Sequence, residues 1–437
     1  MFNPRTGQCS TQLSTFSTFC SGTSAATTFF GFRPSEYQYL TLVRYVLGTL
    51  NAWPVTDDKS SKYSAVFNYS LLIFVGVCWI SIFMFAREKF DKLTFYELGH
   101  TYIEIFMTTV NFVCIRKFLN RQKYLDFKMH LFYYKEVSEF ANKTHKRIHL
   151  ICHVFTLYLL SQTLVGLILF NAIPIWINYA SGNFQHTVLQ NATYEYSVYF
   201  YLPDYVYTHR DAYIALCVAN WFISYITSTL FCALDLLLSL MVFHLWGHIK
   251  ILLHDIETFP PPANKETLFN KDSALAADMY SEEEQKQVTE KLKECIDYHR
   301  LIIDYTKKMS NAFGPMLFIY YMFHQVCGCL LLLECSQMTA EALIRYLPLS
   351  VILCQQLIQL SVIFELIGST SDKLKDAVYS MPWQCMNSSN RRTVSIFLVN
   401  VQKPIHIKAL GVMDVGVRSM AAILKTSLSY FTFLRSK

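Results

Sequence analysis

Ionisable residues recur in the last apolar segment of the chain, at positions where they could line a path for ions. Asp414, Arg418 and Lys425 follow one another at intervals of four and seven residues. The same helical face continues toward the C-terminus with Ser429, Phe433 and Ser436. Charged side chains inside a membrane are costly and usually face a bundle interior or water. The spacing predicts either a helix that lines a pore or a polar helix–helix interface, and it leaves the two open.

Signs of enzymatic chemistry are weak. The chain contains no HExxH, GxSxG, GxGxxG or P-loop pattern. A membrane acyltransferase would need a histidine and an acid on one luminal face, and we find no such pair. His244 and His248 have the i, i+4 spacing of a two-histidine metal site, but no acidic third ligand is close to them in the sequence. We expect hydrogen-bonding histidines at a membrane boundary, no metal, no cofactor and no enzyme.

The composition indicates a membrane protein. Of the 437 residues, 53% are hydrophobic and only 16% are charged, whereas soluble proteins carry about 25% charged residues. Several windows of 20 or more mostly apolar residues are long enough to cross a bilayer. No basic stripe with interleaved aromatic residues is present, so we expect no nucleic-acid partner.

Seven apolar windows predict an all-α bundle of seven transmembrane helices. They lie near residues 66–86, 94–115, 148–175, 213–246, 313–334, 346–368 and 411–434. The second and the seventh are the most polar of the set.

Basic residues set the expected orientation. Three connecting segments hold 24 Lys and Arg, and the segments on the other side hold 5. The rich segments are 116–147, 249–312 and 369–410, and the poor ones are 87–93, 177–212 and 335–345. Positive charge stays cytoplasmic, which predicts a cytoplasmic N-terminus and an extracellular C-terminus, the reverse of a G-protein-coupled receptor. The sequon at Asn191 then lies on the extracellular side and predicts glycosylation there.

The spans and segments give the expected organisation. We expect a cytoplasmic N-terminal region at 1–65, spans one to four at 66–248 with the external loop 177–212, a cytoplasmic loop and helix at 249–312, spans five and six at 313–368, a cytoplasmic segment at 369–410 and the last span at 411–437. From Ser281 the sequence places acidic residues first and basic residues last, as a helix dipole favours. Val288, Leu292, Cys295, Ile302 and Met309 fall on one face, so a long helix that continues the fifth span is predicted.

Aromatic and small residues without charge gather in the outer halves of several spans. The candidate ligand-binding residues are Phe95, Tyr102, Phe106, Leu169, Ala172, Trp176, Tyr213, Cys217, Trp221, Tyr346 and Ser350. An apolar pocket with a few hydroxyl groups suits a small, volatile, largely apolar ligand. The same pattern is also typical of ordinary helix packing or of an interfacial aromatic belt.

Four stretches near the C-terminus resemble the insect odorant receptor family. They are YHRLIIDYTKKMSNAFGPML (298–317), DAVYSMPW (376–383), VQKPIHIKALGVMDV (401–415) and the tail LKTSLSYFTFLRSK (424–437). The tail differs from that of the olfactory co-receptor subunit, so the chain resembles a ligand-tuned subunit.

This resemblance implies a subunit of a tetrameric, odorant-gated, non-selective cation channel in the plasma membrane of sensory neurons, with the olfactory co-receptor as partner. The last helix would line the pore with Lys425, Ser429 and Ser436, and Phe433 would stand where the family has an aliphatic gate residue. The cytoplasmic anchor between subunits would include His299, Tyr379, Trp383, Gln402 and Pro404. The alternative is a seven-span chemoreceptor that conducts nothing and signals through a second messenger.

Overall fold

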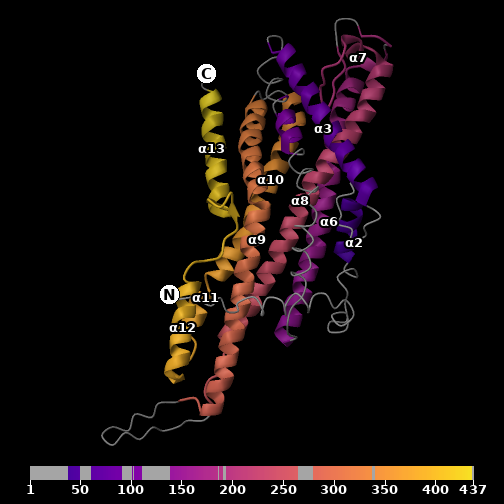
Figure 1. The fold of residues 1–437 in the computed structure, drawn as a ribbon. Helices are drawn as coiled ribbons and strands as arrows, with labels where there is room; N and C mark the ends of the chain where they lie inside the picture. The colour runs from indigo at the N-terminus through magenta and orange to yellow at the C-terminus, as the bar shows by residue number, and fades with distance from the viewer. Residues whose placement is uncertain are drawn as a thin grey trace, which may run out of the picture.

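Long helices that run the length of the molecule dominate the computed structural model (Figure 1). The structure describes residues 38–49, 61–90, 101, 103–110, 138–185, 187–189, 193–263, 279–336 and 340–435. The predicted site residues Phe95, Tyr102, Asn191 and Ser436 lie outside these ranges.

The elements follow one another as helices joined by short connections. They are α2 (Gln38–Thr49), α3 (Ser61–Glu88), α6 (Glu139–Ala180), η3 (Asn183–Gln185), α7 (Asp204–Thr208), α8 (Arg210–Glu257), α9 (Glu282–Cys335), α10 (Ala340–Ser371), α11 (Leu374–Tyr379), η4 (Trp383–Cys385), α12 (Ser388–Val401), β1 (Lys408–Ala409), β2 (Met413–Asp414) and α13 (Val417–Arg435). Residues 103–110 are also helical and belong to the predicted second span.

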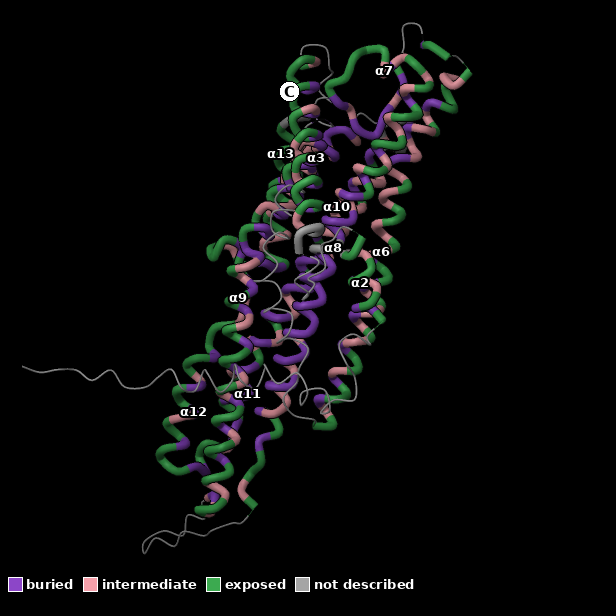
Figure 2. Tube along the Cα trace, turned by 45° about the vertical axis from the view of Figure 1, so that its right-hand side comes forward, coloured by how far each residue is buried: buried purple, intermediate pink, exposed green. Residues whose placement is uncertain are grey.

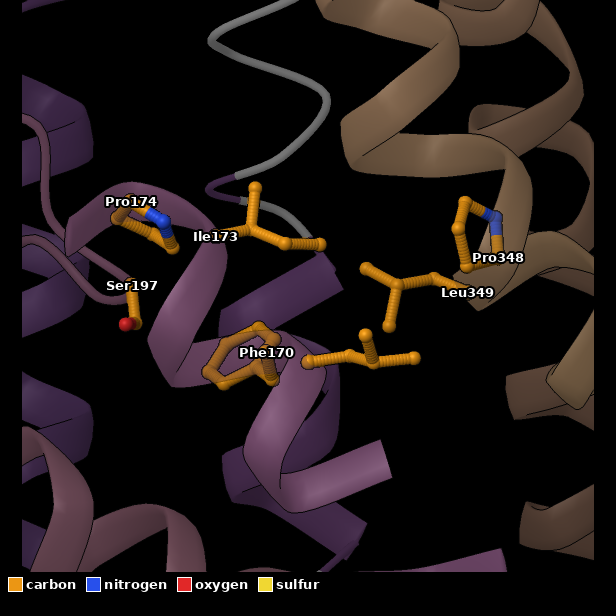
Figure 3. A pocket seen from close by; sticks show the side chains of 7 residues that line it. Phe170, Ile173, Pro174, Ser197, Pro348 and Leu349 are labelled. Carbon is orange, nitrogen blue, oxygen red and sulfur yellow. The ribbon is translucent and has the colours of Figure 1, made fainter. Parts of the chain in front are cut away.

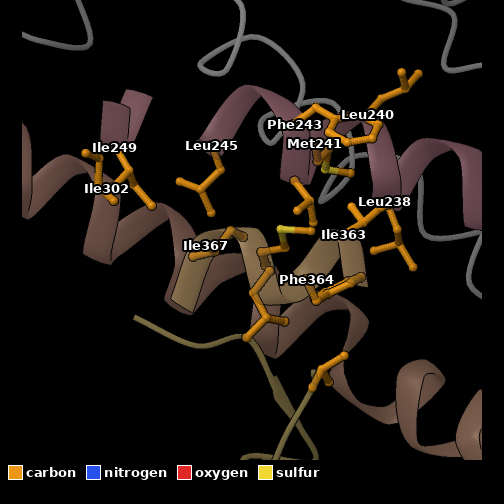
Figure 4. Packing of buried hydrophobic residues seen from close by; sticks show 14 of the residues in the cluster. Leu238, Leu240, Met241, Phe243, Leu245, Ile249, Ile302, Ile363, Phe364 and Ile367 are labelled. Atoms are coloured by element: carbon orange, nitrogen blue, oxygen red, sulfur yellow. The ribbon is translucent and has the colours of Figure 1, made fainter. Parts of the chain in front are cut away.

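Helix α8 forms the centre of the bundle. In its most apolar stretch 88% of the residues are buried, whereas the corresponding share in α6 is 17%. A helix that is apolar on all sides belongs in a core, and Figure 2 shows α8 buried along much of its length. Figure 4 shows the core where α8, α9 and α10 meet, with Phe243, Ile302 and Phe364 among its side chains.

Five helices of the described residues are long and apolar enough to cross a membrane, namely α3, α6, α8, α9 and α10. They correspond to the predicted spans one and three to six. The predicted second span at 94–115 lies mostly outside the described residues. Helix α13 is not among the five, because polar residues interrupt its apolar ones. Apolar side chains on the outer faces of α3 and α6, such as Ile73 and Leu164, are exposed, as contact with lipid requires.

The predicted long helix that continues the fifth span is confirmed as α9, which has 54 residues. A capping box begins it: the Glu284 amide donates to Ser281 Oγ (3.3 Å), and the Ser281 amide donates to Glu284 Oε2 (2.7 Å). The predicted apolar face is also confirmed, because Val288, Leu292, Cys295, Ile302 and Met309 are all buried.

The start of the predicted seventh span is wrong. A two-stranded antiparallel hairpin of β1 and β2 precedes the helix, and α13 begins only at Val417. Leu410 and Gly411 adopt φ values of 51° and 73°, which turn the chain sharply and exclude a helix there. Asp414 therefore does not share a helical face with Arg418, and its carboxylate lies 3.9 Å from Lys408 Nζ across the hairpin.

Two groups of elements lie at opposite ends of the molecule. The end of α13 lies at the same end as α7, whereas α12 and the first turns of α9 lie at the opposite end (Figure 1). At that opposite end α11 and α12 pack against α8 and α9. His299 of α9 is buried there, and its ring meets Phe397 of α12 with the ring centroids 5.5 Å apart.

Candidate functional site

A cavity of about 250 Å³ lies among α3, the helical residues 103–110, α6, α8, α9 and α10. An engineered apolar cavity of about 150 Å³ is enough to bind benzene. This cavity is therefore large enough for a small organic molecule. Its apolar wall comes from several helices and includes Phe74, Val75, Phe170, Ile223, Phe231, Phe323, Leu331, Ile352 and Leu353.

A glycine helps to keep this cavity open. Gly166 of α6 lines it, and a Cβ atom at that position would meet only Ile352 Cδ1, at 4.0 Å. Close-packed interiors leave few voids of this size by accident.

Polar side chains enter the cavity from three neighbouring helical segments. Glu104 and Thr108 come from residues 103–110, Gln162 and Thr163 from α6, and Ser224, Thr227 and Ser228 from α8, and α10 adds Gln356. Few polar groups in a mostly apolar lining are typical of small-molecule sites, where they fix the orientation of the ligand.

A small crevice of about 10 Å³ adjoins the cavity and shares Phe170 and Leu349 with it. Figure 3 shows Ile173 of α6 and Leu349 of α10 facing one another across this crevice. Pro174 and Ser197 form its other side. Phe170 and Leu349 thus stand between the crevice and the cavity.

The predicted ligand-binding residues lie around this region and do not line the larger cavity in the described part of the chain. Phe106 stacks on Phe323, a cavity residue, with ring centroids 6.0 Å apart. Leu169 lines the small crevice. Ala172 and Trp221 are half-buried, and the side chain of Trp176 is 56% exposed.

Tyr213 belongs to a separate aromatic cluster at the end of the molecule that carries α7. Its ring lies 4.7 Å from that of Tyr194 and 4.9 Å from that of Tyr196. Cys217 packs against the same cluster. Asn178 of α6 holds the cluster by donating to the Tyr213 hydroxyl (3.2 Å). This cluster fixes the segment 193–203 on the ends of α6 and α8.

Tyr346 and Ser350 lie together at the start of α10. Both are buried, and the Ser350 hydroxyl donates to the Tyr346 carbonyl at 2.8 Å. Tyr346 packs near Leu331, which lines the cavity. These two residues therefore lie behind the cavity wall. As a set, these eleven residues stay a predicted ligand-binding site.

The polar residues Arg418, Lys425 and Ser429 form a stripe along α13 that faces away from the rest of the chain. Arg418, Lys425 and Ser429 are exposed, and the side chain of Phe433 is 54% exposed. The opposite face packs on α9, where the amide of Gln325 lies 2.9 Å from Ser427 Oγ. The stripe is thus available to water or to another subunit.

Helix α10 holds the first turn of α13. The Val417 amide donates to Glu365 Oε2 at 3.1 Å. A carboxylate at this position satisfies an unpaired amide and complements the positive end of the helix dipole. The position of Gly416 depends on the same contact, because a Cβ there would lie 2.6 Å from Glu365 Oε2.

The predicted anchor residues lie at the end of the molecule opposite to α7. Tyr379, Trp383, Gln402 and Pro404 are exposed. His299 is buried between α9 and α12 within this chain, and burial lowers its pKa. Four of the five predicted anchor residues are therefore accessible to a neighbouring subunit, whereas His299 is enclosed within this chain.

His244 and His248 both form hydrogen bonds, as the sequence predicts, and their partners lie on different helices. Nε2 of His244 lies 3.1 Å from the Tyr39 hydroxyl of α2. Nδ1 of His248 lies 2.7 Å from the Tyr298 hydroxyl of α9. The two rings thus face different partners and join α8 to α2 and α9.

The residues that line the cavity were not among those predicted from the sequence. Glu104 is the one with a clear signal, because an ionisable residue inside a predicted span is expected to have a function. Gly166 and Gln162 carry a weaker signal as small or polar residues in an apolar window. Only the packing of the helices identifies the face that these residues share.

Solved structures of an insect olfactory receptor have the same architecture. Over 91% of this chain and 97% of the other, the fold matches the structure of the insect olfactory receptor OR5 from Machilis hrabei, with a TM-score of 0.68 and 16% sequence identity. The structure of that receptor in complex with eugenol matches equally well.

The proteins that this chain resembles in sequence are odorant receptors as well. The chain is 26% identical over 152 residues to odorant receptor Or2 of Anopheles gambiae and 25% identical over 161 residues to odorant receptor 13a of Drosophila melanogaster. The aligned part covers 33% and 34% of this chain, and it spans 38% of the length of each relative. The 7tm Odorant receptor family model matches residues 97–428. Since this match covers most of the sequence, the chain belongs to the 7tm odorant receptor family.

Proposed function

We propose that this chain is the odorant-binding subunit of a ligand-gated, non-selective cation channel that it forms with the olfactory co-receptor. Membership of the odorant receptor family makes the chain a membrane receptor and not an enzyme. The proposal adds a site for the odorant, a pore helix, a partner and a location in the plasma membrane of sensory neurons.

One observation carries the proposal: the two helices that hold α13 also line the cavity. In α9, Phe323 and Cys327 line the cavity, and Gln325 between them contacts Ser427 of α13. In α10, Gln356 lines the cavity, and Glu365 caps α13 about two and a half turns further along. A ligand that moves α9 or α10 therefore acts directly on α13.

The gating step follows from this connection. A ligand shifts the receptor toward an open state only if it binds that state more tightly than the closed one. Expansion of the cavity would displace α9 and α10 and carry the first turn of α13 with them. The proposed gate is a narrow apolar ring near the outer end of the pore helices, to which this chain contributes Phe433 of α13. Such a hydrophobic constriction gates by dewetting, so a small outward movement is enough.

The orientation and the assembly complete the proposal. The distribution of Lys and Arg favours a cytoplasmic N-terminus and an extracellular C-terminus. The exposed stripe of α13 would then face a central pore in a tetramer, and the exposed side chains at Tyr379 and Trp383 would meet a neighbouring subunit on the cytoplasmic side.

Whole-cell recording tests the proposal. Cells would express this chain alone, the co-receptor alone, or both, and each would be exposed to a panel of volatile compounds with surface expression measured in parallel. The proposal predicts evoked cation current above the co-receptor background only when both chains are present. Ligand-dependent second-messenger production without any current, from a receptor at the surface, would favour the non-conducting alternative.

The gate has its own test. Phe433→Ala removes the bulk that closes the constriction, so we expect a larger current without ligand and an altered open conductance. If Phe433→Ala leaves both quantities unchanged, the gate lies elsewhere.

A further inference from the structure

Three basic residues from different helices form a cluster at the expected cytoplasmic border of the membrane. Arg147 of α6 directly precedes the expected third span, Lys250 of α8 lies about one helical turn beyond the fourth, and Lys373 follows the end of α10. Basic side chains at this depth meet the headgroups of the inner leaflet. These three residues are the basic cluster.

The members of the basic cluster lie close enough to act on one another. Burial lowers the pKa of the Lys250 ammonium, and the charges of Arg147 and Lys373 lower it further. The Lys250 ammonium lies 3.6 Å from the ring centroid of Trp246, and the Trp246 indole donates to Thr370 Oγ1 at 2.9 Å. The tryptophan thus holds Lys250 in place by a cation–π contact and joins α8 to the end of α10.

No carboxylate of the described residues neutralises the basic cluster, whose members form no ion pair there. The acids nearest to Lys373 in the sequence are Asp372 and Asp376, and both act on Lys375 instead. The hydrogen bond from Lys375 to Asp372 (2.8 Å) raises the pKa of Lys375, and the charge of Asp376 adds to this effect. Like charges that approach without a counter-charge repel one another. An anion from outside the chain would remove this repulsion.

An exposed apolar stripe continues from the basic cluster along α6 into the membrane. Leu150, Val154 and Tyr158 follow Arg147 on one face of the helix and are 64%, 58% and 44% exposed. The Tyr158 hydroxyl accepts a hydrogen bond from the Gln355 amide, so the stripe runs beside α10. A lipid whose headgroup meets the basic cluster finds an apolar surface for its acyl chains here, which a soluble anion would not use.

We propose that the basic cluster binds the multiply phosphorylated headgroup of a phosphoinositide in the inner leaflet. Each phosphate monoester carries about 1.5 to 2 negative charges. Two such groups therefore balance the three cations, whereas a headgroup with one net charge, such as that of phosphatidylserine, does not. The proposal goes beyond the proposed function and shares with it only the cytoplasmic placement of these residues.

The bound lipid would stabilise the bundle. Its headgroup would tie α6 and α8 to α10, the helix whose Glu365 accepts from the first turn of α13. A ligand that binds only the folded state raises the free energy of unfolding as its occupancy increases. Thermal unfolding therefore reports binding without any reference to conduction.

Thermal unfolding of the purified full chain in lipid nanodiscs tests the site. The discs contain phosphatidylcholine alone, phosphatidylcholine with phosphatidylinositol bisphosphate at increasing mole fractions, or phosphatidylcholine with phosphatidylserine at equal total charge. Soluble inositol trisphosphate, added to discs of phosphatidylcholine, presents phosphate monoesters without acyl chains. The titration gives the mole fraction of the bisphosphate lipid that produces half of the maximal stabilisation.

Two variants remove one charge each at an exposed position. In discs of phosphatidylcholine, Arg147→Gln and Lys373→Gln should unfold at the wild-type temperature, which shows that the fold is intact. We expect each to raise the half-saturating mole fraction about fivefold, and the double variant about twentyfold. Lys293→Gln is the matched control, because Lys293 is exposed and lies about 30 Å along α9 from the expected fifth span. We expect the control to bind the lipid as the wild type does.

The outcomes separate this inference from the proposed function. Stabilisation that is larger for the bisphosphate lipid than for phosphatidylserine, and that both variants weaken, supports the site. Equal stabilisation by phosphatidylserine, or wild-type binding in both variants, overturns it. Full stabilisation by soluble inositol trisphosphate also overturns it, because the acyl chains then add nothing. Any of these failures leaves the proposed channel standing, and a receptor that conducts no current can still bind the lipid.

Discussion

Replacing Gly166 with leucine places a side chain inside the proposed odorant site. Gly166 lines the cavity on α6, and a Cβ atom there has a single neighbour, Ile352 Cδ1 at 4.0 Å. The new side chain therefore meets open space and enters the cavity. We expect Gly166→Leu to stabilise the receptor and to weaken its response to large ligands.

The magnitude follows from the size of the cavity. If about 150 Å³ holds the six carbons of benzene, the four carbons of a leucine side chain take up about 100 Å³ of the 250 Å³ available. Each buried carbon contributes about 0.8 kcal/mol, and removing a helical glycine contributes about 1 kcal/mol more. Gly166→Leu should exceed Gly166→Ala in stability by about 2 kcal/mol. A ligand that filled the original cavity loses burial of about 3 kcal/mol, which weakens its binding roughly a hundredfold.

The assay compares two readouts on the same variants. Thermal unfolding of the purified receptor measures the gain in stability, and half-maximal ligand concentrations in cells that also express the co-receptor measure the loss of binding. The ligands form a series of increasing size. Gly166→Ala controls for helix propensity, and Gly76→Leu controls for added apolar bulk at an α3 position with nothing within 4 Å of its Cβ.

Opposite signs in the two readouts would mark the cavity as the ligand site. The reasoning is refuted if Gly166→Leu responds to the largest active ligands at wild-type concentrations while it gains stability. In that case the leucine occupies the cavity, and the odorant binds elsewhere. A loss of stability would instead show that the side chain has no room at this position.

Three further changes test how the bundle is held together. Glu365→Ala removes the carboxylate that accepts from the Val417 amide, which should destabilise α13 by about 1 kcal/mol. We expect a lower maximal evoked current at unchanged surface expression, and Glu365→Gln, which keeps an acceptor oxygen, should lose less current. An unaltered current in Glu365→Ala would argue against this link. Gly314→Ala places a Cβ 2.9 Å from the Lys408 carbonyl oxygen, so thermal unfolding should show a loss of about 1–3 kcal/mol, and wild-type stability would contradict the close approach. Asp235→Asn should raise the unfolding temperature, because Asp235 is only 3% exposed and both of its carboxyl oxygens lack a hydrogen-bond partner among the described residues. A lower unfolding temperature would show that the carboxylate has a partner that it needs.

Helix positions were predictable from the sequence because each depends on local signals. The acidic start at Ser281 and the apolar face that contains Leu292 and Ile302 define α9 without knowledge of its neighbours. The hairpin before α13 was missed because an apolar window averages over it. The consecutive left-handed residues Leu410 and Gly411 end any helix there, and glycine was the only local signal of that turn.

The cavity was not predictable in the same way, for a physical reason. Aromatic residues such as Tyr213 fill space, so an aromatic stripe identifies close packing more readily than a hollow. A hollow arises where small or polar residues from different helices, such as Gly166 of α6 and Thr227 of α8, line the same space. That coincidence depends on the rotation of each helix in the bundle, which hydropathy does not give. The resemblance at the C-terminus identified the family from local motifs and gave no information on these rotations.

The most direct test of the account is the accessibility of a cysteine placed at Ser429 of α13. Ser429 is exposed and lies one helical turn before Phe433, so in the proposed orientation it stands on the inner side of the gate. A charged, membrane-impermeant thiol reagent would be applied from outside to cells that express Ser429→Cys with the co-receptor, with the unmodified chain as control. The account predicts irreversible block of the current when the reagent is applied together with an activating odorant, and little block when it is applied alone. An odorant-evoked current that the reagent leaves intact in both conditions would contradict the claim that α13 lines an odorant-gated pore.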